Sequence, residues 1–233
     1  MSEEVGAAGS EGFLSRFIWT ISSPQRLFAD IADGAHWWQP WVWVSLINMV
    51  IAYISVPIQI QLIRLNPRGV PDEQLQQTLE AMEKFGFLGV ISTPVVVLIT
   101  SLIVAGISYL VVSVLADESR FKKYFTIYLY ASIVSSLGLL LGTLLTRMKG
   151  VESIRSIEDA ASSFGPALLI DSDQKILRAI LNSLDVFQLW FYILVGMGVM
   201  HVFKLSGRSA ALVVIPVWLV FVLIALVSAR LGA

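Results

Sequence analysis

The stretch Ser183–Ala233 reads SLDVFQLWFYILVGMGVMHVFKLSGRSAALVVIPVWLVFVLIALVSARLGA and contains two long apolar runs. The runs cover about residues 186–203 and 210–228, and neither carries a formal charge. At a rise of 1.5 Å per residue, a helix of about 20 residues crosses a hydrocarbon core about 30 Å thick. The basic connector between the runs, residues 204–209, is long enough only for a tight turn. We therefore predict a membrane-spanning helical hairpin.

The overall composition places the whole chain in the same class. Of its 233 residues, 56% are hydrophobic and 14% are charged, whereas soluble domains carry about 25% charged residues. A net charge of −1 provides no basic face for nucleic acid, which is not an expected partner. The absence of cysteine excludes disulfides and thiol nucleophiles, and two histidines are too few for a histidine metal site. No metal or cofactor is expected.

Three more apolar stretches predict spans at about residues 41–63, 86–115 and 124–146. With the hairpin, the predicted fold is all-α: a polytopic integral membrane protein with five transmembrane helices. Residues 1–11 are predicted to be a disordered tail because they are rich in Gly, Ala and Ser, and residues 12–233 to be one membrane domain. Interfacial amphipathic helices are expected before the first span and between the third and fourth spans.

The segment before the first span has two local signals. Five apolar residues recur at helical spacing with Arg16 off that face, which predicts a short helix lying on the membrane surface. They are Phe13, Leu14, Phe17, Ile18 and Ile21. Ser23 then precedes Pro24, a pair typical of an N-cap and the first residue of a second short helix.

Positive charge in the shortest turns favours a cytoplasmic N-terminus and an external C-terminus. In that orientation the cytoplasmic segments hold seven Lys and Arg residues and the external segments nine, so the raw count opposes it. Five of the seven, however, lie in the turns 117–123 and 204–209, where positive charge most strongly sets orientation.

Four polar residues in or beside the predicted spans are candidate functional positions. Asn48 and Gln188 lie at membrane depth, where they either bond between helices or line a hydrated pathway. Asp185 begins the fourth span, where it caps the helix or binds a cation. His201 lies near the end of that span and is either an interfacial, hydrogen-bonded side chain or a proton relay.

Small residues at Ser132, Ser136, Gly138 and Gly142 give the third predicted span a smooth face. Such a face permits close approach of a second helix. The partner helix is either another helix of the same chain or a second copy in a homo-oligomer.

The function predicted from these patterns is non-enzymatic. The chain contains no HExxH, P-loop, GxGxxG or GxSxG motif and no pair of intramembrane carboxylates. The leading hypothesis is a scaffold or membrane-organisation factor that contacts membrane lipid and a membrane-protein partner or another copy of itself. The alternative is a channel or secondary transporter, because Pro57, Pro94 and Pro216 interrupt three spans and broken spans often bind substrate.

The order of several features resembles the Yip1 family, particularly its bacterial members. These features are Ser23–Phe28 before the aromatic run Trp37–Trp43, then Leu184–Trp190, Gly196 with Gly198, and the turn Ser206–Ser209. The resemblance implies a five-span membrane protein, and the likeness to bacterial members implies location in the bacterial cytoplasmic (inner) membrane. Eukaryotic members are linked to Rab GTPases and vesicle traffic, but the Asp-Leu-Tyr-Gly-Pro motif of that branch is absent from this chain.

The topology is testable because the chain has no native thiol. A membrane-impermeant thiol reagent applied to intact cells should label Ser163→Cys but not Ser206→Cys. The reverse labelling pattern would overturn the predicted orientation.

Overall fold

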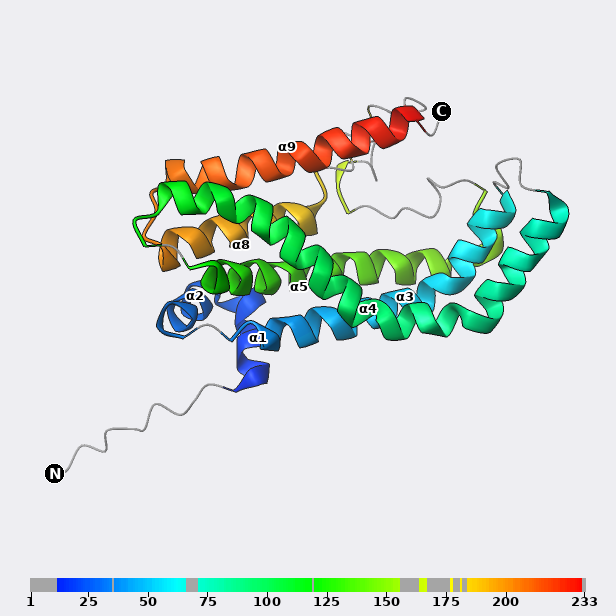
Figure 1. Ribbon diagram of the computed structural model, residues 1–233, viewed down its shortest axis with the longest axis horizontal. Coiled ribbons are helices and arrows are strands. Elements are labelled where there is room, and N and C mark those ends of the chain that lie inside the picture. Colours follow the sequence, from blue (N-terminus) through cyan, green and yellow to red (C-terminus); the bar gives the residue numbers. More distant parts are fainter. Residues whose placement is uncertain are drawn as a thin grey trace.

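The computed structural model describes residues 12–34, 36–65, 71–118, 120–155, 164–166, 177, 181 and 184–231. The described residues form helices without strands, so the predicted all-α class is confirmed (Figure 1). The helices are α1 (Phe13–Ser22), α2 (Pro24–Asp33), α3 (Trp38–Leu65), α4 (Asp72–Leu115), α5 (Phe121–Met148), the 3-10 turn η1 (Val151–Ser153), α8 (Val186–Val202) and α9 (Gly207–Leu231).

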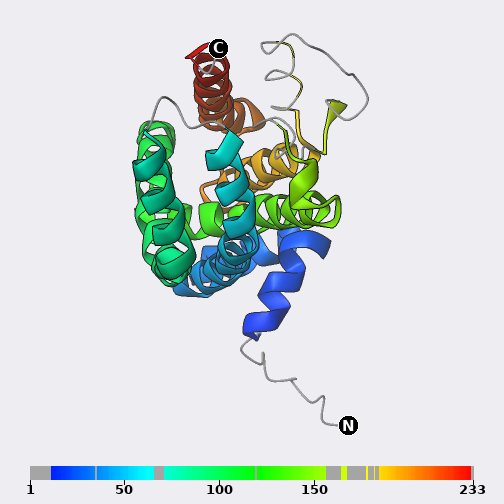
Figure 2. The same cartoon turned by 90° about the vertical axis from the view of Figure 1, so that its right-hand side faces the viewer.

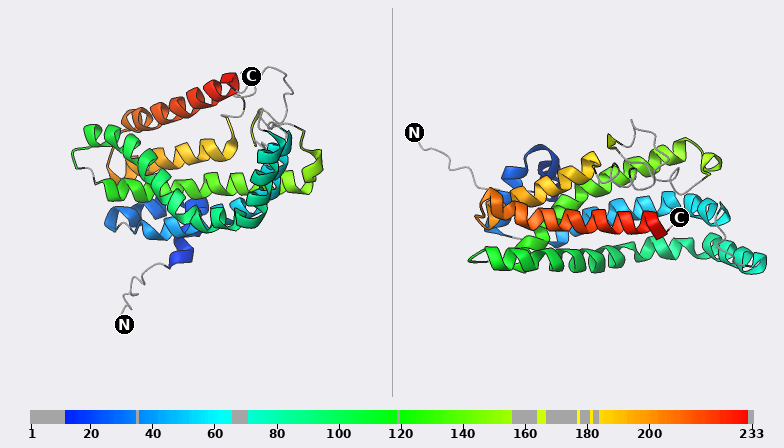
Figure 3. Two further views of the ribbon diagram at one scale, coloured as in Figure 1. Left: turned by 45° about the vertical axis from the view of Figure 1, so that its right-hand side comes forward. Right: turned by 90° about the horizontal axis from the view of Figure 1, so that it is seen from above.

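Helices α3, α4, α5, α8 and α9 lie side by side and alternate in direction, which makes an up-and-down bundle (Figures 1 and 3). The α4–α5 and α8–α9 turns are at one end of this bundle, together with α2. We call this the turn end. Helix α9 ends at the opposite end, and the view in Figure 2 shows α4 at one edge of the bundle.

Helices α3, α4 and α5 are long and apolar enough to cross a membrane, and they contain the first three predicted spans. Helix α8 and the part of α9 from Gly207 to Leu219 are apolar but shorter. Five membrane crossings therefore remain a prediction. The predicted tail 1–11, and most of the predicted helical connector between the third and fourth spans, lie outside the described residues.

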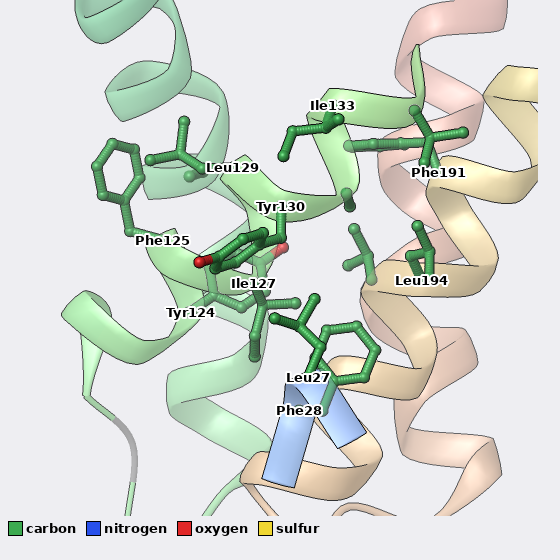
Figure 4. Packing of buried hydrophobic residues seen from close by; sticks show 14 of the residues in the cluster. Leu27, Phe28, Tyr124, Phe125, Ile127, Leu129, Tyr130, Ile133, Phe191 and Leu194 are labelled. Carbon is green, nitrogen blue, oxygen red and sulfur yellow. The ribbon is translucent and has the colours of Figure 1, made fainter. Parts of the chain in front are cut away.

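Helix α5 is the centre of the bundle and contacts α1, α2, α3, α4 and α8. Its residues Ile127, Leu129 and Ile133 are completely buried. Figure 4 shows Ile127 near Leu27 and Phe28 of α2, whereas Leu129 lies on the side of α5 away from Leu194 of α8. Because other helices cover α5 over most of its circumference, it is shielded from lipid on those sides.

Helix α2 is not simply a surface helix of the membrane. Its apolar residues Leu27, Phe28 and Ile31 are buried against α5 and α8, so they contact protein instead of lipid. Ser23 occupies the N-cap position as expected and Pro24 the first turn, but the serine side chain makes no capping hydrogen bond.

The predicted apolar face of α1 is divided between two environments. Phe13 and Phe17 pack against Trp43 of α3, so this part of the face contacts protein instead of lipid. Leu14, Ile18 and Ile21 are each about half exposed, whereas Arg16 and Trp19 are buried on the opposite side. The expectation that Arg16 simply lies off the membrane face is incomplete, because that side of α1 packs on the bundle. The charged side chain therefore points into the protein.

Two glycines allow α5 and α8 to approach each other closely. A Cβ atom at Gly198 of α8 would overlap Ile127 of α5 and would lie 3.1 Å from Cε1 of Phe28. A Cβ atom at Gly138 of α5 would overlap the ring of Phe187 of α8. The core therefore depends on the absence of side chains at both positions.

We expect Gly198→Ala to destabilise the protein by about 1–3 kcal/mol, because the added methyl group overpacks the α5–α8 contact. The matched control is Gly106→Ala on α4, where a Cβ atom meets nothing within 4 Å. The control should be neutral or slightly stabilising, since alanine is the better helix former. Thermal unfolding in one detergent checks both variants, and equal melting temperatures would contradict this account of the packing.

Candidate functional site

Asn48 joins α3 to α5 within the bundle. Its Nδ2 atom donates hydrogen bonds to the Val44 carbonyl oxygen at 2.8 Å and to Oγ of Ser136 on α5 at 2.9 Å. The amide is half-buried, and both bonds remain within the bundle. Asn48 is therefore positioned as a polar link between two helices.

Gln188 makes the equivalent link between α8 and α5. Its Oε1 atom accepts a hydrogen bond from Oγ of Ser135 at 3.2 Å. Because consecutive residues of a helix point about 100° apart, Ser135 and Ser136 reach two different neighbours. The serine pair therefore connects α5 to α8 on one side and to α3 on the other.

Asp185 caps α8. Its Oδ1 atom accepts hydrogen bonds from the backbone N–H groups of Phe187 at 2.9 Å and of Gln188 at 3.1 Å. Its Oδ2 atom accepts a third, at 2.6 Å, from the backbone of Phe164. The carboxylate thereby satisfies donors at the start of the helix, as the capping alternative predicts.

The four candidate polar residues do not form one site. His201 is half-buried near the end of α8, 16 residues after Asp185, which corresponds to about 24 Å along a helix. Asn48 and Gln188 bond to α5 through different serines. A proton-relay role for His201 stays a prediction.

The small-residue face of α5 is occupied within the chain itself. Ser136 bonds to Asn48, and Gly138 lies against Phe187 of α8. Gly142 is buried, and the Ser132 hydroxyl donates to the carbonyl oxygen of Tyr128 in its own helix. Neighbouring helices thus cover much of the face proposed for a homo-oligomer contact.

A buried polar network at the turn end was not predicted from the sequence. The Arg16 guanidinium binds both carboxylate oxygens of Asp30 on α2, at 2.8 and 3.0 Å, and Oε1 of Gln39 on α3 at 2.8 Å. The hydroxyl of Tyr130 on α5 donates to the same Oε1 atom at 3.4 Å. The network therefore connects α1, α2, α3 and α5. The one feature of the sequence that could have indicated this network is a lone arginine in an apolar helix.

This arrangement, a helical bundle with polar side chains paired between helices, can be compared with known proteins. The model of the Yip1 domain matches residues 19–229, which covers most of the chain. The chain belongs to the Yip1 family. It is also 25% identical to the "Membrane protein YknW" of Bacillus subtilis (strain 168) over 221 residues, which are 91% of each chain. No solved structure matches this Yip1-family membrane protein.

We expect Arg16→Met to destabilise the protein by about 3 kcal/mol, because it leaves the Asp30 carboxylate without its partner. The two side chains are only 11% and 25% exposed, respectively. Asp30→Leu should cost a similar amount, and the double variant should recover part of the loss. Thermal unfolding of the two single variants and the double variant measures the coupling.

The matched control for this cycle is the exposed pair Glu80 and Lys84, whose side chains are 66% and 68% exposed. Its coupling should be below about 0.5 kcal/mol. A coupling for Arg16 and Asp30 no larger than that of the control would refute a structural role for the network.

Proposed function

We propose that this protein is a non-enzymatic scaffold or assembly factor that acts through helix–helix contacts with another membrane protein. The observation that carries the proposal is the pairing of the polar groups at membrane depth. Asn48 and Gln188 each bond to a neighbouring helix of the bundle. A transport pathway would instead require such groups to face a hydrated lumen.

A groove between α3 and the first half of α4 supports a contact with a partner. It encloses about 800 Å³ and is lined by amides of Gln59, Gln74 and Gln77 as well as by apolar side chains such as Val56 and Phe85. This combination suits a partner helix that leaves the membrane, because its apolar part meets apolar side chains and its polar part meets amides. We place the partner contact in this groove.

The length of α4 agrees with such a contact. Its 44 residues span about 66 Å, more than twice the thickness of a hydrocarbon core. Its first turns carry acidic residues, among them Asp72 and Glu73, whereas its second half is apolar. The N-terminal part of α4 is thus suited to project from the membrane and to meet a partner there.

The alternative, a channel or secondary transporter, has one specific observation in its favour. Pro57 and Pro94 lie inside α3 and α4, and both helices bend along their length (Figure 1). At Pro94, however, the indole Nε1 of Trp41 donates to the proline carbonyl oxygen at 3.1 Å. This bond joins α3 and α4 at the proline, so we favour a structural role for the bend.

The contact can be tested with a photo-crosslinker attached to single cysteines. We expect Gln77→Cys, in the groove, to give one discrete adduct in native membranes. The adjacent Gln76→Cys, which is exposed but does not line the groove, is the matched control and should give none. The identified protein should then form a complex of fixed stoichiometry with the purified chain by native mass spectrometry.

Two outcomes would contradict the scaffold proposal. One is equal crosslinking from Gln76 and Gln77. The other is saturable solute flux into proteoliposomes that is lost in Asn48→Leu or Gln188→Leu, since that result would make these side chains part of a transport pathway. An adduct with a second copy of the chain would replace the heterologous partner with a homo-oligomer.

A further inference from the structure

A polar cavity of about 700 Å³ lies at the turn end of the bundle. Residues 115–118, 120 and 123 of the α4–α5 connection line one part of it, and residues 202–206 and 209 of the α8–α9 connection line the other. The cavity thus brings together two turns that are about 85 residues apart in the sequence. It is separate from the α3–α4 groove.

Three cations line this cavity: Arg120, Lys123 and Lys204. None of them forms an ion pair within the described part of the chain, although Asp117 and Glu118 line the same cavity. The Lys123 ammonium donates to the carbonyl oxygen of Ala32 at the end of α2, which fixes its position and leaves two N–H groups for another acceptor. The lining therefore offers several donors to an anion.

The backbone adds partial positive charge to that of the three cations. Helix α5 begins at Phe121, beside the cavity, and its first turn receives no side-chain cap from Arg120. Helix α9 begins at Gly207, where Oγ of Ser206 accepts the N–H of Ser209 at 3.2 Å. Helix N-termini carry a partial positive charge that favours anions such as phosphate. Two of them adjoin the three cations.

Lys204 has an unusual backbone conformation. Its φ of 55° makes it the one residue other than glycine with a positive φ in the described part of the chain. Glycine or asparagine would adopt this conformation with less strain. A lysine at this position strains the backbone, but its side chain supplies a cation to the cavity.

The surroundings of the cavity favour a lipid as the source of the anion. Ile107, Leu110 and Val114 follow one another along one side of α4 and are 64, 65 and 84% exposed. This exposed apolar surface of α4 ends next to Leu115, which lines the cavity. A lipid with an acyl chain along this surface would therefore have its headgroup at the cavity.

We propose that the cavity binds the headgroup of an anionic glycerophospholipid of the phosphatidylglycerol type. Arg120, Lys123 and Lys204 contact the phosphate, and the hydroxyl groups of the headgroup donate to the carboxylates of Asp117 and Glu118. The acyl chains lie along the exposed side of α4. This site is independent of the partner contact in the α3–α4 groove, so either proposal can fail without the other.

The proposal is tested by titrating the purified full chain with phosphatidylglycerol and, separately, with phosphatidylethanolamine in native mass spectrometry. We expect the double variant R120Q/K204Q to raise the apparent Kd for phosphatidylglycerol about tenfold or more, because each cation near a lipid surface contributes about 1 kcal/mol. Phosphatidylethanolamine, which has no net charge, should bind the wild-type chain about tenfold more weakly.

The matched control is R64Q/K84Q, which removes two exposed cations far from the cavity: Arg64 in the last turn of α3, and Lys84 in the first third of α4. Its Kd for phosphatidylglycerol should stay within about twofold of wild type, because the charges are more than a Debye length from the cavity. An equal loss in both double variants would show a general charge effect and overturn the proposal. Displacement of the lipid by equimolar inorganic phosphate would overturn its lipid part.

A second variant separates lipid binding from folding. Lys204→Gly removes both the cation and the backbone strain, so it should raise the melting temperature in detergent while weakening phosphatidylglycerol binding several-fold. If Lys204→Gly keeps the lipid affinity of the wild type, Lys204 does not belong to the lipid site and the role proposed for its backbone conformation is refuted.

Discussion

A polar group carried into hydrocarbon needs a hydrogen-bond partner inside the protein, and this need explains the central position of α5. Its adjacent serines, Ser135 and Ser136, supply those partners to two helices at once. Two glycine contacts between α5 and α8 then bring the backbones close enough for the apolar side chains to interlock. The polar bonds and the apolar packing therefore favour the same arrangement of helices.

The N-terminal helices depend on a second polar constraint. Arg16 is almost fully buried, so its charge must be neutralised within the protein, and Asp30 does this with two hydrogen bonds. The resulting contact brings α1 and α2 to the end of the bundle, where the apolar residues of α2 pack on α5 and α8. The family match, which begins at residue 19, includes all of α2 and the end of α1.

The sequence predicted the helices well because span length and uninterrupted apolar composition are local properties. The three longest spans lie inside α3, α4 and α5, and α4 begins at Asp72, directly after Pro71. The partners of the helices were less predictable. Nothing in the local pattern distinguishes an arginine that faces water from one that meets a carboxylate 14 residues later, as Arg16 does.

The candidate site shows the same limit. The sequence predicts Asn48 and Gln188 to be polar residues at membrane depth, but helical periodicity does not reveal that each bonds to one of two neighbouring serines. The cavity at the turn end is also a property of tertiary structure, because its two halves come from turns that are distant in the chain. In the sequence, the short charged turns indicate orientation, but they do not indicate that the two turns line one cavity.

The serine pair also has a consequence for biosynthesis. Asn48 is synthesised earlier than Ser136, which follows it by 88 residues. The hydrogen bond between them can therefore form as soon as α5, the third apolar helix, enters the membrane. Ser135 is made 53 residues before Gln188 and must wait for α8. Until then, its hydroxyl and the glycine surface of α5 lie open to lipid or to an insertion factor. The order of synthesis thus builds the bundle from one side of α5 to the other.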